Sequence, residues 1–232
     1  MSRIIAVVSG AIRRLEMRFT PKGTAILDLL MAGKVAQGGA EYLSFAAPRF
    51  LGRYAEALAE QVKEGDALLV TGELVQERWE QDGQKRSRLR ILGRSAARIN
   101  APHVAEDEHG PLLVGATNRV AISGNLVDAP EVREVGRGSL LGRMTVAAHA
   151  SKERVHFVTV KAWEELAEAM RPLKKGDPVY VEGRLRTERW NREDGGVAYL
   201  DVVVASSVIG GERVSVKSQE EAATNDEDDL PF

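Results

Sequence analysis

The sequence contains an internal repeat as long as a whole domain. The residues from Gly72 to Trp79 recur from Gly183 to Trp190, a shift of 111 positions, with glycine, leucine, glutamate, arginine and tryptophan in register. Further pairs agree in the same order, some after small insertions: Ser9-Gly10 with Ser123-Gly124, Ala55-Glu56-Ala57-Leu58 with Ala167-Glu168-Ala169-Met170, Gly65-Asp66 with Gly176-Asp177, and Asp82-Gly83 with Asp194-Gly195. Two copies of so long a unit indicate a duplicated domain rather than a solenoid of short repeats. We therefore expect two domains with the same fold.

Both copies have the same predicted order of five strands and one helix. Apolar runs rich in β-branched residues and bounded by glycine-rich turns indicate strands at 4–8, 25–31, 42–46, 68–75 and 86–92, and again at 120–126, 141–147, 155–161, 179–185 and 198–204. An alanine-rich segment with apolar residues four apart predicts a helix at 53–62, and the matching helix is at 164–170. This is the order of an OB-fold, a small Greek-key barrel. We therefore expect an all-β chain of two tandem OB-fold barrels, each with one α-helix between strands 3 and 4.

The predicted domains are separated by segments of different composition. Residues 1–99 form the first and more divergent barrel, and residues 118–210 form the second. Residues 100–117 contain two prolines, two glycines and a run of three acids, so we expect a linker. Residues 211–232 are expected to be a disordered tail that ends in an acidic tip.

The composition argues against several classes of site. The chain has no cysteine and only four histidines, so disulfides and thiolate zinc sites are excluded, and we expect no metal and no cofactor. A nuclease would need clustered carboxylates or a histidine placed as a base, but the histidines lie in the linker or singly on predicted strands, so we expect no enzyme. Neither a signal peptide nor an apolar run of about 20 residues is present, which predicts a soluble, cytoplasmic protein.

Charge is segregated along the chain. Residues 218–232 hold six of the 34 acidic residues and no Lys or Arg, so the body has 32 basic against 28 acidic residues. This excess fits a polyanionic partner about as well as an ordinary solvated surface. The last seven residues are too charged to fold alone but end in an apolar tip, which is typical of a segment bound by another protein. They are Asp226, Glu227, Asp228, Asp229, Leu230, Pro231 and Phe232.

Two of the three tryptophans occupy the same place in the two copies, one at the end of each fourth predicted strand. Trp79 and Trp190 both stand just before a hairpin marked by Asp-Gly. A ring on a hairpin stem can project from the barrel, where stacking of a base contributes about 1–3 kcal/mol. A lone tryptophan here would more often pack into the core. Repetition of Glu-Arg-Trp favours the exposed position, because Arg78 and Arg189 place positive charge beside the rings.

The strand after Trp79 is rich in arginine. Alternation in an extended strand places Arg86, Arg88 and Arg90 on one side, as a ladder of guanidinium groups suited to phosphates. The alternative is an edge strand charged to prevent aggregation. The second copy has alanine, leucine and valine at these places, so the two copies are not equivalent.

Short motifs of the second copy, spread over residues 118–210, suggest a family. They are Ser-Gly-Asn-Leu from Ser123, Pro-Glu-Val-Arg from Pro130, Phe157 with Trp163 six residues later, Leu-Ala-Glu from Leu166, Lys-Gly-Asp from Lys175, and Glu-Gly-Arg-Leu-Arg-Thr from Glu182 leading to Trp190. Together they resemble the bacterial single-stranded DNA-binding proteins, in the form with two OB-folds per chain. The first copy is similar but more divergent, with Leu51 at the place of Trp163 and Phe50 beside it.

The resemblance implies which side chains contact DNA. Those expected to stack on bases are Phe19, Phe45, Trp79, Phe157, Trp163 and Trp190, although Phe157 and Trp163 could also pack into the core. Those expected to contact phosphates are Arg78, Lys85, Arg86, Arg88, Arg90, Arg133, Arg184, Arg186 and Arg189. Phe19 is included because the segment around it is similar to the family's loop after the first strand.

The resemblance also implies a function. It predicts a protein that binds single-stranded DNA without sequence readout during replication, recombination and repair. Four OB-folds per assembly would make it a homodimer, with pairing of first strands as one way to join two chains. The acidic tip would dock partner enzymes, although the spacer at 210–225 is short. The alternatives are an RNA or structured-DNA chaperone, a paralogue specialised for recombination or DNA uptake, and a protein that acts chiefly as an interaction hub.

Overall fold

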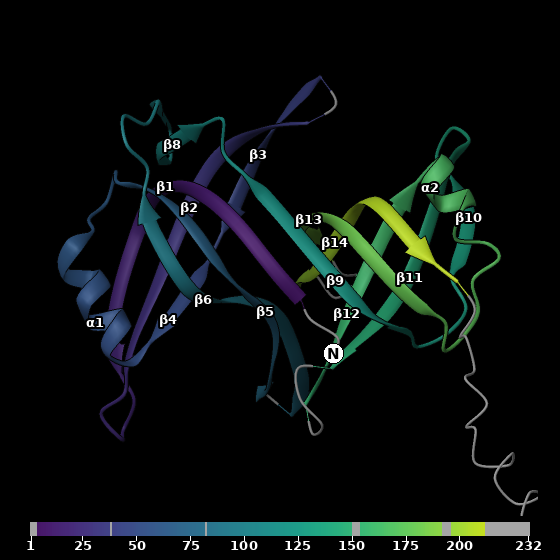
Figure 1. Cartoon of the computed structure of the whole chain (residues 1–232), viewed down its shortest axis with the longest axis horizontal. Helices are drawn as coiled ribbons and strands as arrows, with labels where there is room; N and C mark the ends of the chain where they lie inside the picture. Colours follow the sequence, from purple (N-terminus) through teal and green to yellow (C-terminus); the bar gives the residue numbers. More distant parts are fainter. Residues whose placement is uncertain (1–3, 38, 82, 150–153, 192–195, 212–232) are drawn as a thin grey trace, which may run out of the picture.

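In the computed structural model, which describes residues 4–37, 39–81, 83–149, 154–191 and 196–211, each sequence copy folds into a small β-barrel and the two barrels share one continuous sheet (Figure 1). The first barrel consists of β1 (Ile4–Phe19), β2 (Ala25–Gln37), β3 (Ala40–Ala46), β4 (Pro48–Leu51), α1 (Gly52–Gln61), β5 (Ala67–Gln81) and β6 (Gln84–Arg98). The second consists of β9 (Asn118–Leu126), β10 (Glu131–Val135), β11 (Ser139–His149), β12 (Val155–Trp163), α2 (Glu165–Glu168), β13 (Pro178–Asn191) and β14 (Val197–Gly210). Between the two barrels in the sequence are β7 (Val104–Asp107) and β8 (Gly110–Val114). The predicted all-β fold with two tandem OB-fold barrels is confirmed.

The strands are longer than their apolar runs. β1 has 16 residues, of which the sequence predicted only the first five, and β6 has 15. A long strand can serve several neighbours: the first half of β1 pairs with β5 and β9, and its second half pairs with β2. Beyond the core these strands carry polar side chains, so the apolar pattern ends before the backbone pairing does.

The two helices differ in length. α1 buries Ala55 and Leu58 and ends shortly before Gly65, which has a φ of 88°, close to the predicted range of 53–62. α2 is a single turn and is shorter than the predicted 164–170. The backbone N–H groups of Met170 and Arg171 bond to carbonyls three residues back, so the chain tightens instead of continuing the α-helix.

Pairing of β1 with β9 joins the two barrels. The strands are antiparallel, and the register places Ala6 opposite Val120. Because Ser9-Gly10 matches Ser123-Gly124, these two residues hold the same place in the two copies, and a local two-fold axis passes between them. From the sequence, pairing of first strands was one way in which two chains could be joined. The structure excludes this way, because β1 and β9 pair with each other inside one chain and are flanked on their other sides by β5 and β13.

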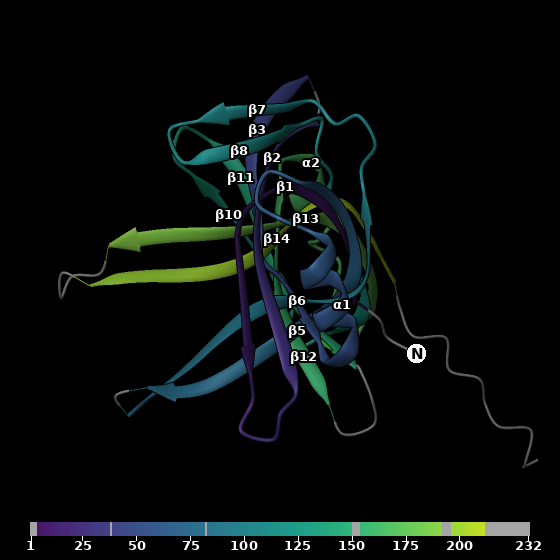
Figure 2. The ribbon, with the colours of Figure 1, turned by 90° about the vertical axis from the view of Figure 1, so that its left-hand side faces the viewer.

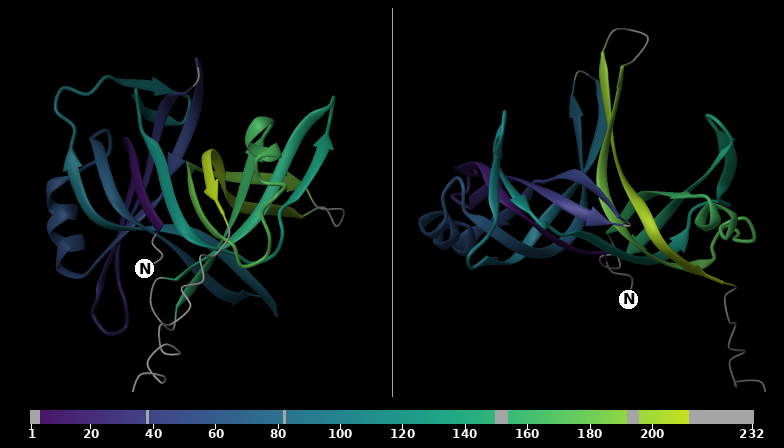
Figure 3. Two further views of the ribbon diagram at one scale, coloured as in Figure 1. Left: turned by 45° about the vertical axis from the view of Figure 1, so that its right-hand side comes forward. Right: turned by 90° about the horizontal axis from the view of Figure 1, so that it is seen from above.

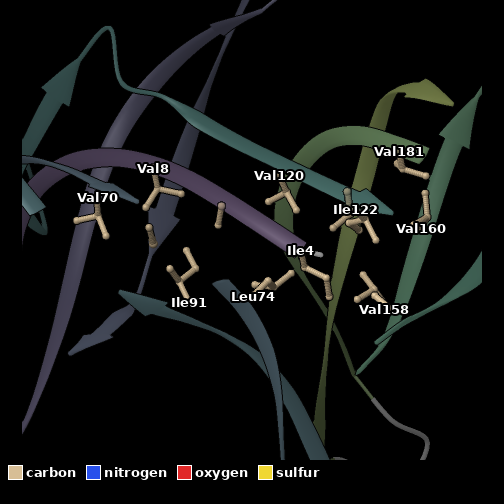
Figure 4. Packing of buried hydrophobic residues seen from close by; sticks show 14 of the residues in the cluster. Ile4, Val8, Val70, Leu74, Ile91, Val120, Ile122, Val158, Val160 and Val181 are labelled. Atoms are coloured by element: carbon tan, nitrogen blue, oxygen red, sulfur yellow. The ribbon is translucent and has the colours of Figure 1, made fainter. Parts of the chain in front are cut away.

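Apolar side chains from both barrels form one hydrophobic cluster across this junction (Figure 4). Ile4 of β1 and Leu74 of β5 come from the first barrel, and Ile122 of β9 and Val158 of β12 come from the second. All four are buried, and burial of each such side chain contributes about 1.5–3 kcal/mol. The barrels therefore share a core as well as a sheet.

Gly72 and Gly183 begin the repeated segment, and each lies at a β-bulge where only glycine fits. The register between the two hairpin strands shifts next to each glycine. A Cβ at these positions would lie 2.4 Å from the carbonyl oxygen of Leu92 and 2.3 Å from that of Val204, which excludes a side chain. Such bulges bend a strand. The sequence repeat thus corresponds to a repeated bend at the base of each hairpin.

The segment 100–117 is more than the linker that was predicted. β7 and β8 form a hairpin, and β8 extends the sheet by pairing in parallel with β2 at Gly33. Arg13 of β1 holds the hairpin: its guanidinium donates hydrogen bonds to Asp107 at 2.6 Å and to the Pro111 carbonyl at 3.0 Å. Glycine and proline composition alone could not reveal this tertiary pairing.

The described residues contain neither a candidate membrane helix nor a candidate metal centre. Neither helix there is long and apolar enough to cross a bilayer. Within the same residues, no group of three or more His, Cys, Asp or Glu side chains is placed to hold a metal ion.

Replacing Ile122 with alanine is expected to destabilise both barrels together. The change leaves a cavity in the shared cluster, and such changes cost about 2–5 kcal/mol. Chemical denaturation followed by circular dichroism and by tryptophan emission should give one coincident transition at lower denaturant. The control is Val197→Ala, at an exposed side chain on β14, with an expected change below about 0.5 kcal/mol. Two separate transitions, one for each barrel, would contradict a shared core.

Candidate nucleic-acid interface

The tryptophan-bearing hairpins of both barrels project from the same side of the molecule. Figures 2 and 3 show β5–β6 and β13–β14 extending beyond the barrels in one direction. Trp79 is 40% exposed and Trp190 is 47% exposed, so neither ring lies in the core. The prediction that these rings are on the surface is confirmed. Their common direction would allow one extended ligand to meet both hairpins.

The second barrel adds two more exposed rings on β12. Phe157 and Trp163 are exposed, so the alternative that they pack into the core is wrong. On the neighbouring β11, Arg143 stands opposite Lys161 and is also exposed. Lys161 forms an ion pair with Glu188 of β13 at 2.6 Å. This face therefore offers two aromatic rings with an exposed arginine beside them.

The matching face of the first barrel has one ring fewer. Phe45 is exposed, and the guanidinium of Arg13 lies 5.4 Å from its ring centroid. Leu51, at the place of Trp163, is exposed but is not aromatic. The neighbouring Phe50 is fully buried against β6, so it offers no surface to a base.

An ion-pair network occupies this face of the first barrel. Arg49 and Arg90 each bind both Asp28 and Glu77, at 2.7–3.1 Å, and Arg88 binds Glu77 at 3.0 Å. Partial burial alone would raise the pKa of both carboxyl groups. The hydrogen bonds and positive charges of the arginines outweigh it and hold the pKa of Asp28 and of Glu77 below the ordinary values. Both carboxylates are therefore ionised at neutral pH.

The predicted guanidinium ladder of β6 is only partly available to a ligand. Arg90 is 8% exposed and its guanidinium is held by the network, so its assignment to a phosphate is wrong. Arg88 is exposed, binds Glu77 and lies 5.4 Å from the ring centroid of Trp79. Arg86 is exposed directly opposite Trp79 in the hairpin. Alternation placed the three arginines on one side, but only the tertiary structure shows that carboxylates share that side.

Four of the other predicted phosphate contacts lie on the two hairpins. Arg78 and Arg189 are exposed immediately before the two tryptophans. Arg186 is exposed on β13, and within the described residues it has no ion pair. Arg184 is half-buried, with its guanidinium 3.8 Å from the ring centroid of Tyr42 in the other barrel.

The remaining predicted contacts are apart from the hairpins or outside the described residues. Phe19 is exposed at the end of β1, beside the turn to β2. Arg133 is exposed on β10, 3.9 Å from Glu131. Lys85 lies on β6, but its side chain is outside the described part of the chain, as is the acidic tip at 226–232.

Sequence reasoning missed three side chains near these rings. Tyr199 is 64% exposed and stands opposite Arg189 in the second hairpin. Its place follows from the hairpin register, which the Asp-Gly turn alone does not fix. Tyr42 and Arg143 depend on contacts between segments far apart in sequence, so no local signal could have identified them.

Hydrogen bonds also fix the first hairpin against the second barrel. The backbone N–H of Gln76 donates to Nδ1 of His156 at 3.1 Å, and the backbone N–H of Leu89 donates to Asp201 at 2.8 Å. Burial lowers the pKa of His156, so its ring is neutral and Nδ1 can accept. The hairpins are therefore held in place at their bases.

Comparison with known families covers both barrels. The pattern of the Single-strand binding protein family matches residues 3–99 and 117–209. The chain belongs to this family. As a member of the single-strand binding protein family, it carries the family's domain twice, and the family predicted from the sequence is confirmed.

Relatives in the family have a similar sequence and structure over most of the chain. The Single-stranded DNA-binding protein of Thermus thermophilus is 36% identical over 203 residues, which cover 82% of this chain and 76% of that protein. That of Deinococcus radiodurans is 31% identical over 208 residues, which cover 82% and 69%. The crystal structure of the wild-type single-stranded DNA binding protein from Thermus aquaticus has a TM-score of 0.75 at 29% identity, covering 95% of this chain and 98% of that one.

Replacing Trp190 with alanine is expected to weaken binding of single-stranded DNA by about 1–3 kcal/mol, because one exposed stacking surface is lost. Wild-type tryptophan emission should fall on addition of poly-dT, and the variant should lose part of this quenching. The control is Tyr54→Phe, on α1 away from the hairpins, with unchanged affinity. Equal affinity and equal quenching in Trp190→Ala and the wild type would contradict a role for this ring.

Replacing Asp28 with asparagine is expected to lower the free energy of unfolding by about 1–3 kcal/mol at pH 7, because arginines of the network lose a partner. The folded-state pKa of Asp28 is below its unfolded value of about 3.9, so the stabilisation is full above that value and is lost as the pH falls through the folded-state pKa. Urea denaturation at pH 7 and pH 3 should show the difference shrinking at pH 3. Asp128→Asn, at an exposed pair with Lys175, is the control. A difference independent of pH would contradict this role.

Proposed function

We propose that this chain binds single-stranded DNA without reading its sequence. The observation that carries the proposal is the projection of two hairpins, each with an exposed tryptophan preceded by an arginine, from one side of a protein of the single-strand binding protein family. The Thermus and Deinococcus relatives are named single-stranded DNA-binding proteins.

Stacking and charge would carry the binding. Every base has a π-face, so rings such as Trp79, Trp163 and Trp190 accept any base that is free of a duplex. Exposed arginines at the hairpins would neutralise phosphates and release counterions, which makes the affinity depend on salt. A duplex hides its base faces in the stack, so these rings favour the single strand.

The two barrels would contribute unequally. The second barrel has Phe157, Trp163 and Trp190, whereas the first has Phe45 and Trp79 with Leu51 between them in sequence. The ion-pair network also ties Arg49 and Arg90 to carboxylates. The second barrel is therefore the stronger site in this proposal.

We further propose that the protein protects single strands in the cytoplasm during replication, recombination and repair, and that residues 226–232 recruit partner enzymes. The C-terminal end of β14 lies on the other side of the molecule from the hairpin tips (Figures 2 and 3). The 21 residues that follow Gly211 can span at most about 70 Å. A partner bound at the tip could thus work beside an occupied DNA face.

The working assembly in this proposal is a homodimer with four OB-folds. Since β1 and β9 are paired within the chain, two chains would need another surface. Ile5, Leu69, Tyr180 and Ile209 are exposed apolar side chains that strand register places on the outer face of β1, β5, β13 and β14, opposite the core. A second copy packed on this face would cover them and leave the hairpins free.

Titration with poly-dT at several salt concentrations tests the function. We expect saturable binding whose logarithmic affinity falls linearly with the logarithm of salt, and weaker competition by duplex DNA and by RNA of equal length. Light scattering on the same samples should give the mass of two chains. Tighter binding of RNA or of duplex would overturn the proposal in favour of a chaperone.

A chain that lacks residues 226–232 separates DNA binding from recruitment. Its DNA affinity should be equal or higher, because a competing acidic segment is gone, while capture of repair and replication enzymes should be lost. A chain with the same residues scrambled is the control for charge alone. Loss of DNA binding in the shortened chain would contradict the assignment of binding to the barrels.

A further inference from the structure

The two barrels meet at two seams that the local two-fold axis relates. At the first seam, the β5–β6 hairpin of the first barrel meets β12 of the second. At the second seam, the β13–β14 hairpin of the second barrel meets β3 of the first. The axis between Ala6 and Val120 would make these seams alike if the two copies were identical in sequence.

Side chains bridge the first seam. Gln76 donates its backbone N–H to His156 and accepts the backbone N–H of Phe157 at 3.4 Å through Oε1. Arg78 donates to the same Oε1 of Gln76 at 2.7 Å, and its guanidinium lies 5.5 Å from the ring centroid of Phe157. The hairpin thus binds directly to the strand that faces it.

The second seam is bridged by Arg184, which lies over the ring of Tyr42 at 3.8 Å, and it also contains a groove. Its volume is about 410 Å³, and it is lined by Tyr42, Leu43 and Phe45 of β3 and by Arg184 and Arg186 of β13. A second hollow of about 260 Å³ shares the Phe45 wall and leads to Arg88, which lies over Trp79. The two hollows therefore connect the second hairpin with the rings of the first barrel.

The repeat shows why the seams differ in charge. At the shift of 111 positions, Arg184 corresponds to Glu73 and Arg186 corresponds to Val75. Glu73 forms an ion pair with Arg94 at 2.7 Å, whereas Arg186 has no ion pair within the described residues. The second seam thus has two guanidinium groups where the first has a carboxylate and an apolar side chain.

We propose that single-stranded DNA crosses from one barrel to the other through the groove of the second seam, between Phe45 and Arg186, and does not cross at the first seam. The proposal rests on the function proposed above and adds the path of the strand. A base stacks on the exposed Phe45 ring, and Arg186 binds the phosphate that follows. The hollow beyond Phe45 then directs the strand towards Arg88 and Trp79.

A cysteine scan tests this path, because the natural chain has no cysteine. Leu43→Cys places a thiol in the groove, and Val155→Cys places one at the corresponding position of the first seam. The rate of maleimide labelling is measured with and without a dT oligomer of about 35 nucleotides, long enough for two OB-folds at about 4–16 nucleotides each. We expect DNA to slow labelling of Leu43→Cys at least 10-fold and that of Val155→Cys less than 2-fold.

A charge variant gives a second readout with a matched control. Arg186→Val introduces valine, the residue that the first copy has at the corresponding position, Val75. The control, Arg189→Val, removes one positive charge from the same hairpin at a position that does not line the groove. Arg186→Val should weaken binding of the long oligomer about 10-fold and that of an oligomer of about 8 nucleotides less than 2-fold, because the short one need not cross between barrels. Arg189→Val should weaken both by similar factors.

The outcomes separate the path from the function. If the unmodified chain binds no single-stranded DNA, the proposed function fails. Suppose instead that the unmodified chain binds the long oligomer. If DNA then slows labelling of both Leu43→Cys and Val155→Cys, or of neither, the strand does not select the second seam and the path is wrong. Equal effects of Arg186→Val on the long and the short oligomer would also overturn the path.

Discussion

Antiparallel pairing of β1 with β9 is the interaction on which the rest of the structure depends. It converts two small barrels into one sheet and closes one hydrophobic cluster around Ile4 and Ile122. Because the pairing is symmetric about Ala6 and Val120, it also sets the directions of the two hairpins, which leave the same side of the molecule. The edge that two separate chains could have used to pair is occupied within one chain.

The two barrels have the same backbone features but differ in the charged side chains on their surfaces. Gly72 and Gly183 keep the same bulge, and Trp79 and Trp190 keep the same exposed place on their hairpins. On the barrel face that carries Phe157 and Phe45, the pair of Lys161 with Glu188 in the second barrel corresponds to a network in the first. In that network Asp28 and Glu77 bind four arginines, Arg18, Arg49, Arg88 and Arg90. Internal ion pairs on this face neutralise its arginines and lower its attraction for a polyanion. At corresponding positions the second barrel exposes three rings, Phe157, Trp163 and Trp190, whereas the first exposes two, Phe45 and Trp79.

Much of this could be predicted from the sequence, and the failures have a common cause. The repeat, the order of strands and helices, and the exposure of both hairpin tryptophans were predicted correctly, because they depend on local patterns that occur twice. Arg90 was assigned wrongly, since Asp28 lies far away in sequence and only the sheet brings the two together. The hairpin in segment 100–117 was missed for the same reason, because its pairing with β2 and its bond to Arg13 are tertiary.

By itself, the sequence determined that the chain is a duplicated OB-fold protein of the single-strand binding protein family, with aromatic rings and arginines at corresponding places in both copies. Apolar periodicity, turn residues and repeated motifs encode these features within short segments. Only the tertiary structure decided which arginines are held in ion pairs and that the two first strands pair with each other. These outcomes depend on the register between distant strands and on the charges that it brings within hydrogen-bonding distance, and no short segment contains that information.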